Sequence, residues 1–184
     1  MFLDRDGVIC REVNYMSDPS QFRLLPNVGE SLRKLTERNY KLVVISNQSG
    51  IAFGNITLKN IKKVNDKMIS ELAKYNVTVD GIYYCPHHPE GKGIYRKICN
   101  CRKPKPGMLL NAATELNIDL SFSYMVGDKK SDIIAGANAG CKTILVLTGY
   151  GKEELMLLRG ANSLKPDYVV NDLIEAAEII LTKG

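Results

Sequence analysis

Long hydrophobic runs are absent from this sequence of 184 residues, in which no apolar run exceeds four residues. A membrane-spanning helix needs about 20 apolar residues, so we expect no membrane segment and no membrane partner. An apolar export signal is also missing near the start, where Asp4, Arg5 and Asp6 interrupt the first apolar run. This favours a cytoplasmic protein. Internal repeats, low-complexity tracts and linker-like segments are absent too, so we expect one domain over residues 1–184.

The composition is that of a globular protein with a mild excess of positive charge. Hydrophobic residues make up 45% and charged residues 24% of the chain, which excludes disorder and coiled coil. Lys and Arg number 25 against 20 Asp and Glu, for a net charge of +5. The stretch 92–105 holds six Lys and Arg and no acid, so the rest of the chain is almost neutral. One basic loop permits a phosphate-bearing partner and does not by itself indicate nucleic-acid binding.

Short apolar runs alternate with segments of helical periodicity, which predicts an α/β fold. We expect a doubly wound, mostly parallel sheet with helices on both faces. Ligands of such sheets bind at the carboxyl ends of the strands, so the polar residues that follow each strand are candidates for a site. The expected strands are 1–3, 41–46, 80–85, 123–126, 142–147 and 168–170, and the expected helices are 28–38, 57–75, a segment that starts at Pro106, 131–139 and 172–181.

Three acidic residues follow two of these strands. Asp4 and Asp6 come directly after the first strand, and Asp128 follows strand 123–126. Residues two apart in extended backbone point to the same side, so these carboxylates should converge and would repel one another without a cation. Hard oxygen ligands suit Mg²⁺, and a carboxylate beside Mg²⁺ indicates phosphoryl transfer through an aspartyl-phosphate. An isolated D-x-D-G could equally be a simple turn before Gly7.

Polar and basic residues from two other segments should reach the same edge. Ser46 is the last residue of strand 41–46, and its hydroxyl could hold phosphate oxygens. Arg102 and Lys103 lie in the basic loop and could balance the charge of a phosphoryl group. Serines often end strands, and basic loops are usually solvated. A functional role for these three residues is therefore favoured only because the acidic motifs accompany them.

A cysteine-rich loop follows the third expected strand, over residues 85–105. Cys85 and His87 form a C-x-H pair, and Cys99 and Cys101 form a C-x-C pair 12 residues later. Three thiolates and one imidazole make a tetrahedral set for Zn²⁺ with no position left for water, so we expect a structural site. Spacing alone does not separate His87 from His88. Two further cysteines, Cys10 and Cys141, lie outside the cluster and are interpreted as small core residues, with Cys10 partly exposed.

Together these segments resemble the haloacid dehalogenase superfamily of phosphatases. Its pattern is D-x-D-G after the first strand, Ser or Thr after the second, then a Lys and an acidic G-D motif, and the match spans positions 4–132. The resemblance implies a Rossmann-like fold with Asp4 as nucleophile and Asp6 as general acid and then general base. It also implies that Ser46, Arg102 and Lys103 bind the phosphoryl group, that Lys129 contacts the substrate, that Asp132 orients Lys103 or the metal shell, and that Asp4, Asp128 and the backbone carbonyl of Asp6 hold Mg²⁺.

The zinc loop narrows the resemblance to the branch of this superfamily that contains heptose bisphosphate phosphatases and histidinol-phosphate phosphatases. This resemblance rests on four sequence segments, FLDRDG, SNQSGIA, CPHHP and CNCRKP. No segment is long enough for a separate lid domain, so the enzyme should be capless. The resemblance implies Mg²⁺-dependent removal of the 7-phosphate from a heptose 1,7-bisphosphate, with substrate-binding residues Asp4, Arg5, Asp6, Glu12, Val13, Asn14, Tyr15, Ser46, Asn47, Gln48, Ser49, Arg102, Lys103 and Lys129.

Two alternatives stay open. Histidinol-phosphate phosphatases share the acidic motifs and the zinc loop, so the motifs do not exclude that substrate. A basic module that is stabilised by zinc and binds nucleic acid would also account for this loop and for the positive charge. It would leave Asp4, Asp6 and Asp128 without a role, because anions repel phosphates when no metal is present, and it should show salt-sensitive binding. We therefore expect a small-molecule sugar bisphosphate as partner, no nucleic acid, and a monomer.

Overall fold

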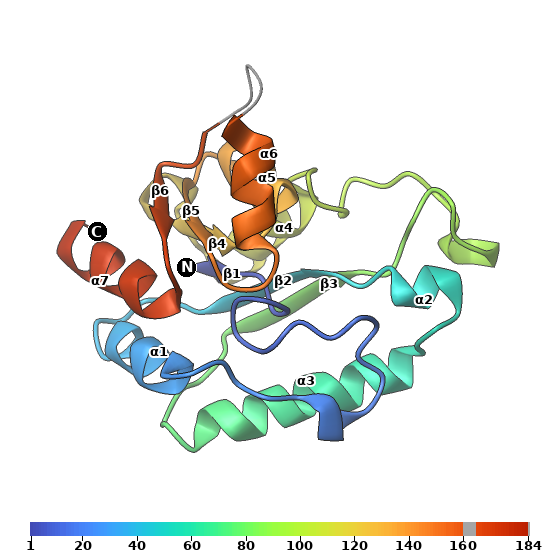
Figure 1. Cartoon of the computed structure of the whole chain (residues 1–184), viewed down its shortest axis with the longest axis horizontal. Coiled ribbons are helices and arrows are strands. Elements are labelled where there is room, and N and C mark those ends of the chain that lie inside the picture. The colour runs from blue at the N-terminus through green and yellow to red at the C-terminus, as the bar shows by residue number, and fades with distance from the viewer. Residues whose placement is uncertain (160–164, 184) are drawn as a thin grey trace.

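Six parallel strands form one sheet at the centre of the protein (Figure 1). The structure is a computed structural model, and it describes residues 1–159 and 165–183. The strands lie in the order β3-β2-β1-β4-β5-β6, and every neighbouring pair is parallel. The expected doubly wound parallel sheet is therefore confirmed. The strands are β1 (Phe2–Leu3), β2 (Val43–Asn47), β3 (Gly81–Cys85), β4 (Tyr124–Gly127), β5 (Lys142–Val146) and β6 (Tyr168–Val170).

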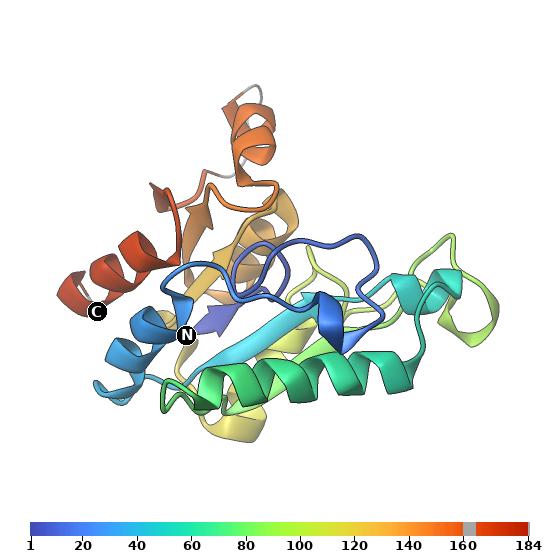
Figure 2. The same ribbon diagram turned by 60° about the horizontal axis from the view of Figure 1, so that its bottom comes forward.

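Helices cover both faces of this sheet (Figure 2). One apolar cluster joins α1, α3 and α7 to one face, and a second joins α4 and α5 to the other. The two residues of β1 show how the strands serve both clusters, because Leu3 belongs to the first and Phe2 to the second. The helices are α1 (Val28–Thr36), α2 (Gly50–Phe53), α3 (Leu58–Ala73), α4 (Gly107–Leu116), α5 (Lys130–Ala139), α6 (Gly151–Arg159) and α7 (Leu173–Lys183).

Local signals set the ends of several helices where the sequence predicted them. Thr57 caps α3, since its side chain accepts from the backbone N–H of Asn60 while Asn60 accepts from that of Thr57. Gly140 ends α5 in the left-handed conformation with φ of 87°. The predicted boundaries differ from the observed ones by a few residues, as is usual at helix and strand ends. Two helices were not predicted: the short α2, and α6, which follows β5.

The chain reverses direction across the sheet beside β1. It runs outward from β1 through β2 to β3, then returns to place β4 on the other side of β1. This is the switch point at which doubly wound sheets bind ligands, and the segments that follow β1, β2 and β4 meet there. Among the described residues, no helix combines the length and the apolar character that a membrane crossing requires.

Candidate active site

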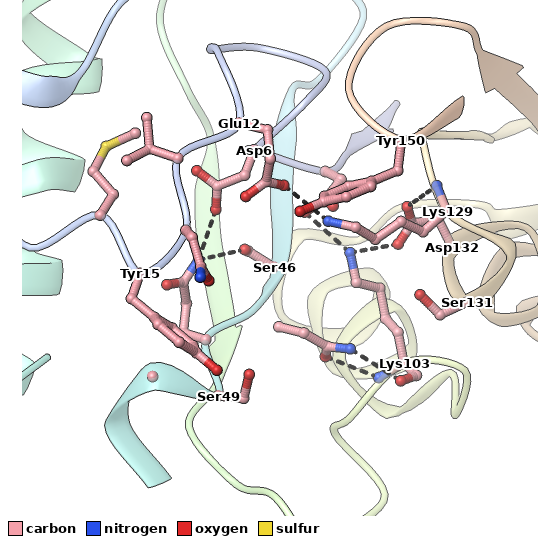
Figure 3. Close-up of a pocket in the computed structure, with 17 residues that line it drawn as sticks. Asp6, Glu12, Tyr15, Ser46, Ser49, Lys103, Lys129, Ser131, Asp132 and Tyr150 are labelled. Carbon is pink, nitrogen blue, oxygen red and sulfur yellow. Dashed lines mark hydrogen bonds and ion pairs between the residues drawn. The ribbon is translucent and has the colours of Figure 1, made fainter. Parts of the chain in front are cut away.

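A cavity of about 260 Å³ opens at the switch point (Figure 3). Residues from the loops after β1, β2, β4 and β5 line it, together with Lys103 from the basic loop. Polar side chains dominate the wall, which suits a hydrophilic ligand. The lining residues are Asp4, Asp6, Glu12, Val13, Asn14, Tyr15, Met16, Ser46, Asn47, Gln48, Ser49, Gly50, Lys103, Lys129, Ser131, Asp132 and Tyr150.

The buried ammonium group of Lys103 lies between two carboxylates at the floor of this cavity. Its Nζ is 3.1 Å from Oδ1 of Asp4 and 2.7 Å from Oδ1 of Asp132, and it donates to the carbonyl of Ile45 at 2.7 Å. Burial acts to lower the pKa of Lys103, but the attraction of Asp132 and Asp4 outweighs it and raises the pKa. Lys103 is therefore a fixed cation beside Asp4.

Asn47 explains how a lysine from a long loop is held so firmly. Its side-chain NH₂ donates to the carbonyl of Lys103 at 3.0 Å, and its Oδ1 accepts the backbone N–H of Lys103 at 3.1 Å. This pair of hydrogen bonds ties the loop to the end of β2. The predicted Asn47 is thus both a lining residue and the anchor of Lys103.

Asp128 is a fully buried carboxylate with one oxygen that accepts no hydrogen bond from the described residues and lies 4.0 Å from Nζ of Lys129. Its Oδ2 accepts the backbone N–H of Tyr150 at 2.9 Å, whereas Oδ1 has no hydrogen-bond partner within residues 1–159 and 165–183. Burial, and then the nearby charge of Asp4, raise the pKa of Asp128 from 3.8 to about 8. A buried carboxylate oxygen without a partner is costly, and a cation would satisfy it.

The three carboxylates of Asp4, Asp128 and Asp132 present oxygens within 4.8 Å of one another. Oxygen-rich sites of this kind fit Mg²⁺, which keeps several water ligands. The backbone leaves room for the carboxylate of Asp128 because positions 7 and 149, which both lie against it, are glycine. Gly7 has φ of 86°, and a Cβ there would come within 2.2 Å of Oδ2 of Asp128.

Asp6 lies at the cavity wall but is held from behind by Arg5. The guanidinium donates from Nε to Oδ1 of Asp6 at 3.1 Å and from Nη2 to Oδ2 at 2.8 Å. Gln48 donates to Oδ2 of Asp6 at 3.0 Å and to the hydroxyl of Ser46 at 2.8 Å. One side chain thereby links the predicted acid–base residue to the predicted phosphate-binding hydroxyl.

Glu12 and Lys129 face each other across the upper wall of the cavity in Figure 3. Their side chains form an ion pair of 2.9 Å, and Nζ of Lys129 also lies 4.6 Å from the centre of the Tyr150 ring. Burial acts to lower the pKa of Lys129, but Asp128, Asp4 and Glu12 raise it above its usual value. Tyr150 was missed from the sequence because it follows β5, after the last recognised motif.

Two predicted substrate-binding residues lie elsewhere in the described structure. The side chain of Arg5 is buried behind Asp6 rather than exposed in the cavity, because the residue between two outward-facing residues points inward. The guanidinium of Arg102 donates to the carbonyl of His87 at 3.2 Å and does not reach the cavity wall. Met16, Gly50 and Ser131 also line the wall and were not predicted as site residues, although Gly50 and Ser131 stand inside recognised motifs.

The four predicted zinc ligands gather in one cluster. The sulfur atoms of Cys85, Cys99 and Cys101 are 3.1–3.5 Å apart, and Nδ1 of His87 is 3.3 Å from Sγ of Cys101. These separations are close to those of ligands around a tetrahedral Zn²⁺. His88 points elsewhere, since its ring packs on Phe53 and its Nδ1 accepts from the backbone N–H of Glu90. Cys10 and Cys141 are buried, so the expected partial exposure of Cys10 is wrong.

A parallel sheet with these carboxylates at its switch point defines a hydrolase of the haloacid dehalogenase type. The family model of HAD-like hydrolases matches residues 100–176. The chain is 42% identical to the D-glycero-beta-D-manno-heptose-1,7-bisphosphate 7-phosphatase of Haemophilus ducreyi, over 95% of this chain and 94% of that protein. It is 41% identical to the protein of the same name from Haemophilus influenzae, over 98% of this chain and 95% of that one.

A solved structure supports the same relationship. The crystal structure of D,D-heptose 1,7-bisphosphate phosphatase from B. bronchiseptica, complexed with magnesium and phosphate, superposes with a TM-score of 0.89. It is 34% identical and covers 100% of this chain and 98% of that chain. The present chain belongs to the heptose-1,7-bisphosphate 7-phosphatase family of HAD-like hydrolases.

Proposed function

We propose that this protein is a Mg²⁺-dependent phosphatase that removes the 7-phosphate of D-glycero-D-manno-heptose 1,7-bisphosphate. The observation that carries the proposal is the arrangement around Asp4, whose carboxylate lies 3.1 Å from the buried Lys103 ammonium and near the oxygen of Asp128 that accepts no hydrogen bond from the described residues. Relatives at 41–49% identity carry the name of this activity. The polar cavity is open to a sugar bisphosphate, and it needs no separate lid domain.

The chain's own residues account for each step. A carboxylate oxygen of Asp4 attacks phosphorus, and the bond between phosphorus and the C7 oxygen breaks while Asp6 protonates that oxygen. Asp6 then accepts a proton from a water molecule that attacks the aspartyl-phosphate, and Asp4 is released. Lys103 and the hydroxyl of Ser46 stabilise the transferring group. Asp4, Asp128 and the carbonyl of Asp6 would hold Mg²⁺, which would balance the charge of the phosphoryl group.

Recognition of the sugar falls to lining residues outside the Asp4–Lys103 pair. Glu12, Asn14 and Tyr15 come from the segment after β1, and Lys129 from the segment after β4. Carboxylate and amide groups suit sugar hydroxyls, and an ammonium suits a phosphate. These residues therefore have groups that can bind the part of a substrate that does not react.

A substrate comparison tests the proposal directly. With Mg²⁺ present, phosphate release is measured from heptose 1,7-bisphosphate and from histidinol phosphate on the same preparation. We expect kcat/KM to favour the heptose by about 10²-fold or more, because histidinol has no second phosphate and fewer hydroxyls to pair with the polar wall. A preference for histidinol phosphate would instead support the other substrate.

Magnesium binding should depend on pH through Asp128. Its pKa is raised from 3.8 to about 8 in the folded protein without metal, so between these values the folded state holds one proton more than the unfolded state. The stability that this proton contributes is present at low pH and is lost as the pH rises to about 8. Mg²⁺ must displace the proton, so its affinity should fall by up to about tenfold per pH unit below 8.

Calorimetry in two buffers of different ionisation enthalpy measures this effect. We expect about one proton released per Mg²⁺ near pH 6.5 and almost none near pH 9. The increase in melting temperature on adding Mg²⁺ should likewise be larger at the higher pH. Equal proton release at both pH values would contradict the assignment of Asp128.

We also propose that Cys85, His87, Cys99 and Cys101 hold a structural Zn²⁺. The two histidines offer a matched test. His87→Ala should reduce zinc content from about one ion per chain to well below half, whereas His88→Ala should retain it, because only the ring of His87 faces the sulfur atoms. Zinc content is read by elemental analysis. Equal zinc in both variants would refute the ligand set.

Zinc removal should loosen residues 85–105 before it affects the sheet. The loop contains a single turn of 3₁₀ helix, at 93–95, and two exposed isoleucines, so little apolar packing holds it without the metal. Hydrogen exchange after chelation should speed up in this loop first.

A further inference from the structure

We propose that Asn65, on α3, is a positioning residue that holds the general acid Asp6 in place through Arg5. The inference rests on the proposed phosphatase activity and adds a residue that lies outside the cavity. Asn65 does not line the cavity wall, and its contact with the site runs through one hydrogen bond to Arg5. Its effect on the reaction must therefore be transmitted by the guanidinium.

The guanidinium of Arg5 is fixed on three sides. Nε and Nη2 form a fork that meets both oxygens of Asp6, and Nη1 donates to Oδ1 of Asn65 at 3.1 Å. The side chain is only 2% exposed. Because the guanidinium is planar, fixing Nη1 also fixes the direction of the fork. Asn65 thus sets the plane in which the carboxylate of Asp6 is held.

The burial of Arg5 and Asn65 indicates that these two side chains do more than fill space in the core. Arg5 is the largest of the fully buried side chains in the described structure, and buried arginines are rare. Asn65 is the polar member of the buried face of α3, whose other members are Ile61, Val64, Met68 and Leu72. Desolvating a guanidinium and an amide is unfavourable, and apolar residues of similar size would pack the same space. What the polar pair adds is a defined orientation for Asp6.

The position of Asp6 controls proton transfer to the leaving oxygen. Of the three partners of its carboxylate, only Arg5 contacts both oxygens at hydrogen-bond distance, while Gln48 and Cys10 each contact one. Without Asn65, Nη1 loses its acceptor, so only the two hydrogen bonds to Asp6 itself set the plane of the guanidinium, and the fork and the carboxylate can shift together. A general acid that is displaced from its hydrogen-bond geometry loses most of its effect.

Hydrolysis of two different phosphate esters distinguishes a positioning role of Asn65 from a purely structural role. A sugar alcohol is a poor leaving group and needs a proton from Asp6, whereas p-nitrophenolate leaves without one. The value of kcat/KM reports steps up to formation of the aspartyl-phosphate. We therefore expect Asn65→Leu to lower kcat/KM for heptose 1,7-bisphosphate by about 10- to 100-fold, and for p-nitrophenyl phosphate by less than about threefold. The ratio of the two values is unaffected by any inactive fraction of the preparation.

Two further variants complete the experiment. Asn65→Asp keeps an acceptor oxygen for Nη1 and should restore the wild-type ratio. Met68→Ala removes a buried side chain from the same face of α3 but keeps both partners of the hydrogen bond between Arg5 and Asn65, so it should leave the ratio unchanged even if it lowers stability. If Asn65→Leu yields too little folded protein, Asn65→Ser takes its place.

The outcomes are distinct. A selective loss on the sugar ester, reversed by Asn65→Asp, supports the positioning role. An equal loss on both esters, or none on either, overturns it and leaves Asn65 as a packing residue. If the wild-type protein with Mg²⁺ hydrolyses neither ester, the proposed function itself fails, and that result is visible before any variant is compared.

Discussion

Replacing Asp4 with Asn is expected to lower phosphatase turnover by on the order of 10⁴-fold or more while the fold stays intact. The carboxamide has no charged oxygen to attack phosphorus, so the aspartyl-phosphate cannot form. The fold should tolerate the change because Oδ1 of Asn can still accept the hydrogen bonds that Oδ1 of Asp4 receives from the backbone N–H of Arg5 and from Lys103. The loss of one negative charge also relieves the repulsion with Asp128.

Activity, melting temperature and covalent phosphorylation together test this assignment. Rapid quenching of the wild-type enzyme with labelled substrate should trap phosphate on the chain, and Asp4→Asn should trap none. Asp66→Asn is the matched control, since Asp66 is an exposed aspartate that pairs only with Lys62 among the described side chains; it should keep full activity. Substantial turnover by Asp4→Asn would show that another group is the nucleophile.

The sequence was most informative where candidate functional residues lie at or just after the end of a strand. Asp4, Ser46 and Asp128 were predicted to converge because parallel strands share an edge, and the sheet order places β1 between β2 and β4 as that argument requires. The cysteine spacing likewise predicted the cluster that the structure shows. In both cases the predictive signal lies within a short stretch of sequence, and the fold brings these stretches together. The roles of the individual residues remain predictions until variants are measured.

Contacts between distant segments were beyond the sequence. The pairing of Arg5 with Asn65 joins residues 60 positions apart, and nothing near Asn65 distinguishes it from other polar residues on a helix. His87 could not be chosen over His88 by spacing, because the choice depends on where each ring points. The helix α6 was missed since Met156 and Leu157 are both exposed, so the segment lacks the apolar stripe by which helices are recognised.

The second large effect is expected from Lys103→Met. Removing the ammonium should lower kcat by about 10²- to 10³-fold, the usual loss when a group that stabilises transition-state charge is removed. It should also cost stability, because Asp4 and Asp132 lose their shared cation in a buried site. Breaking a buried ion pair on one side typically costs about 3–5 kcal/mol. Urea unfolding and steady-state kinetics measure the two losses separately.

A double variant distinguishes the two roles of Lys103. Asp132→Asn removes the second charge while its remaining carbonyl oxygen can still accept the backbone N–H of Lys129, the bond that caps α5. Combined with Lys103→Met, it should recover much of the lost stability, because one buried carboxylate no longer lacks a partner. Activity should stay low, since the ammonium of Lys103 no longer faces the phosphoryl group on Asp4. If activity recovers together with stability, Lys103 acts only by holding the site together, and the stabilisation of charge must come from elsewhere.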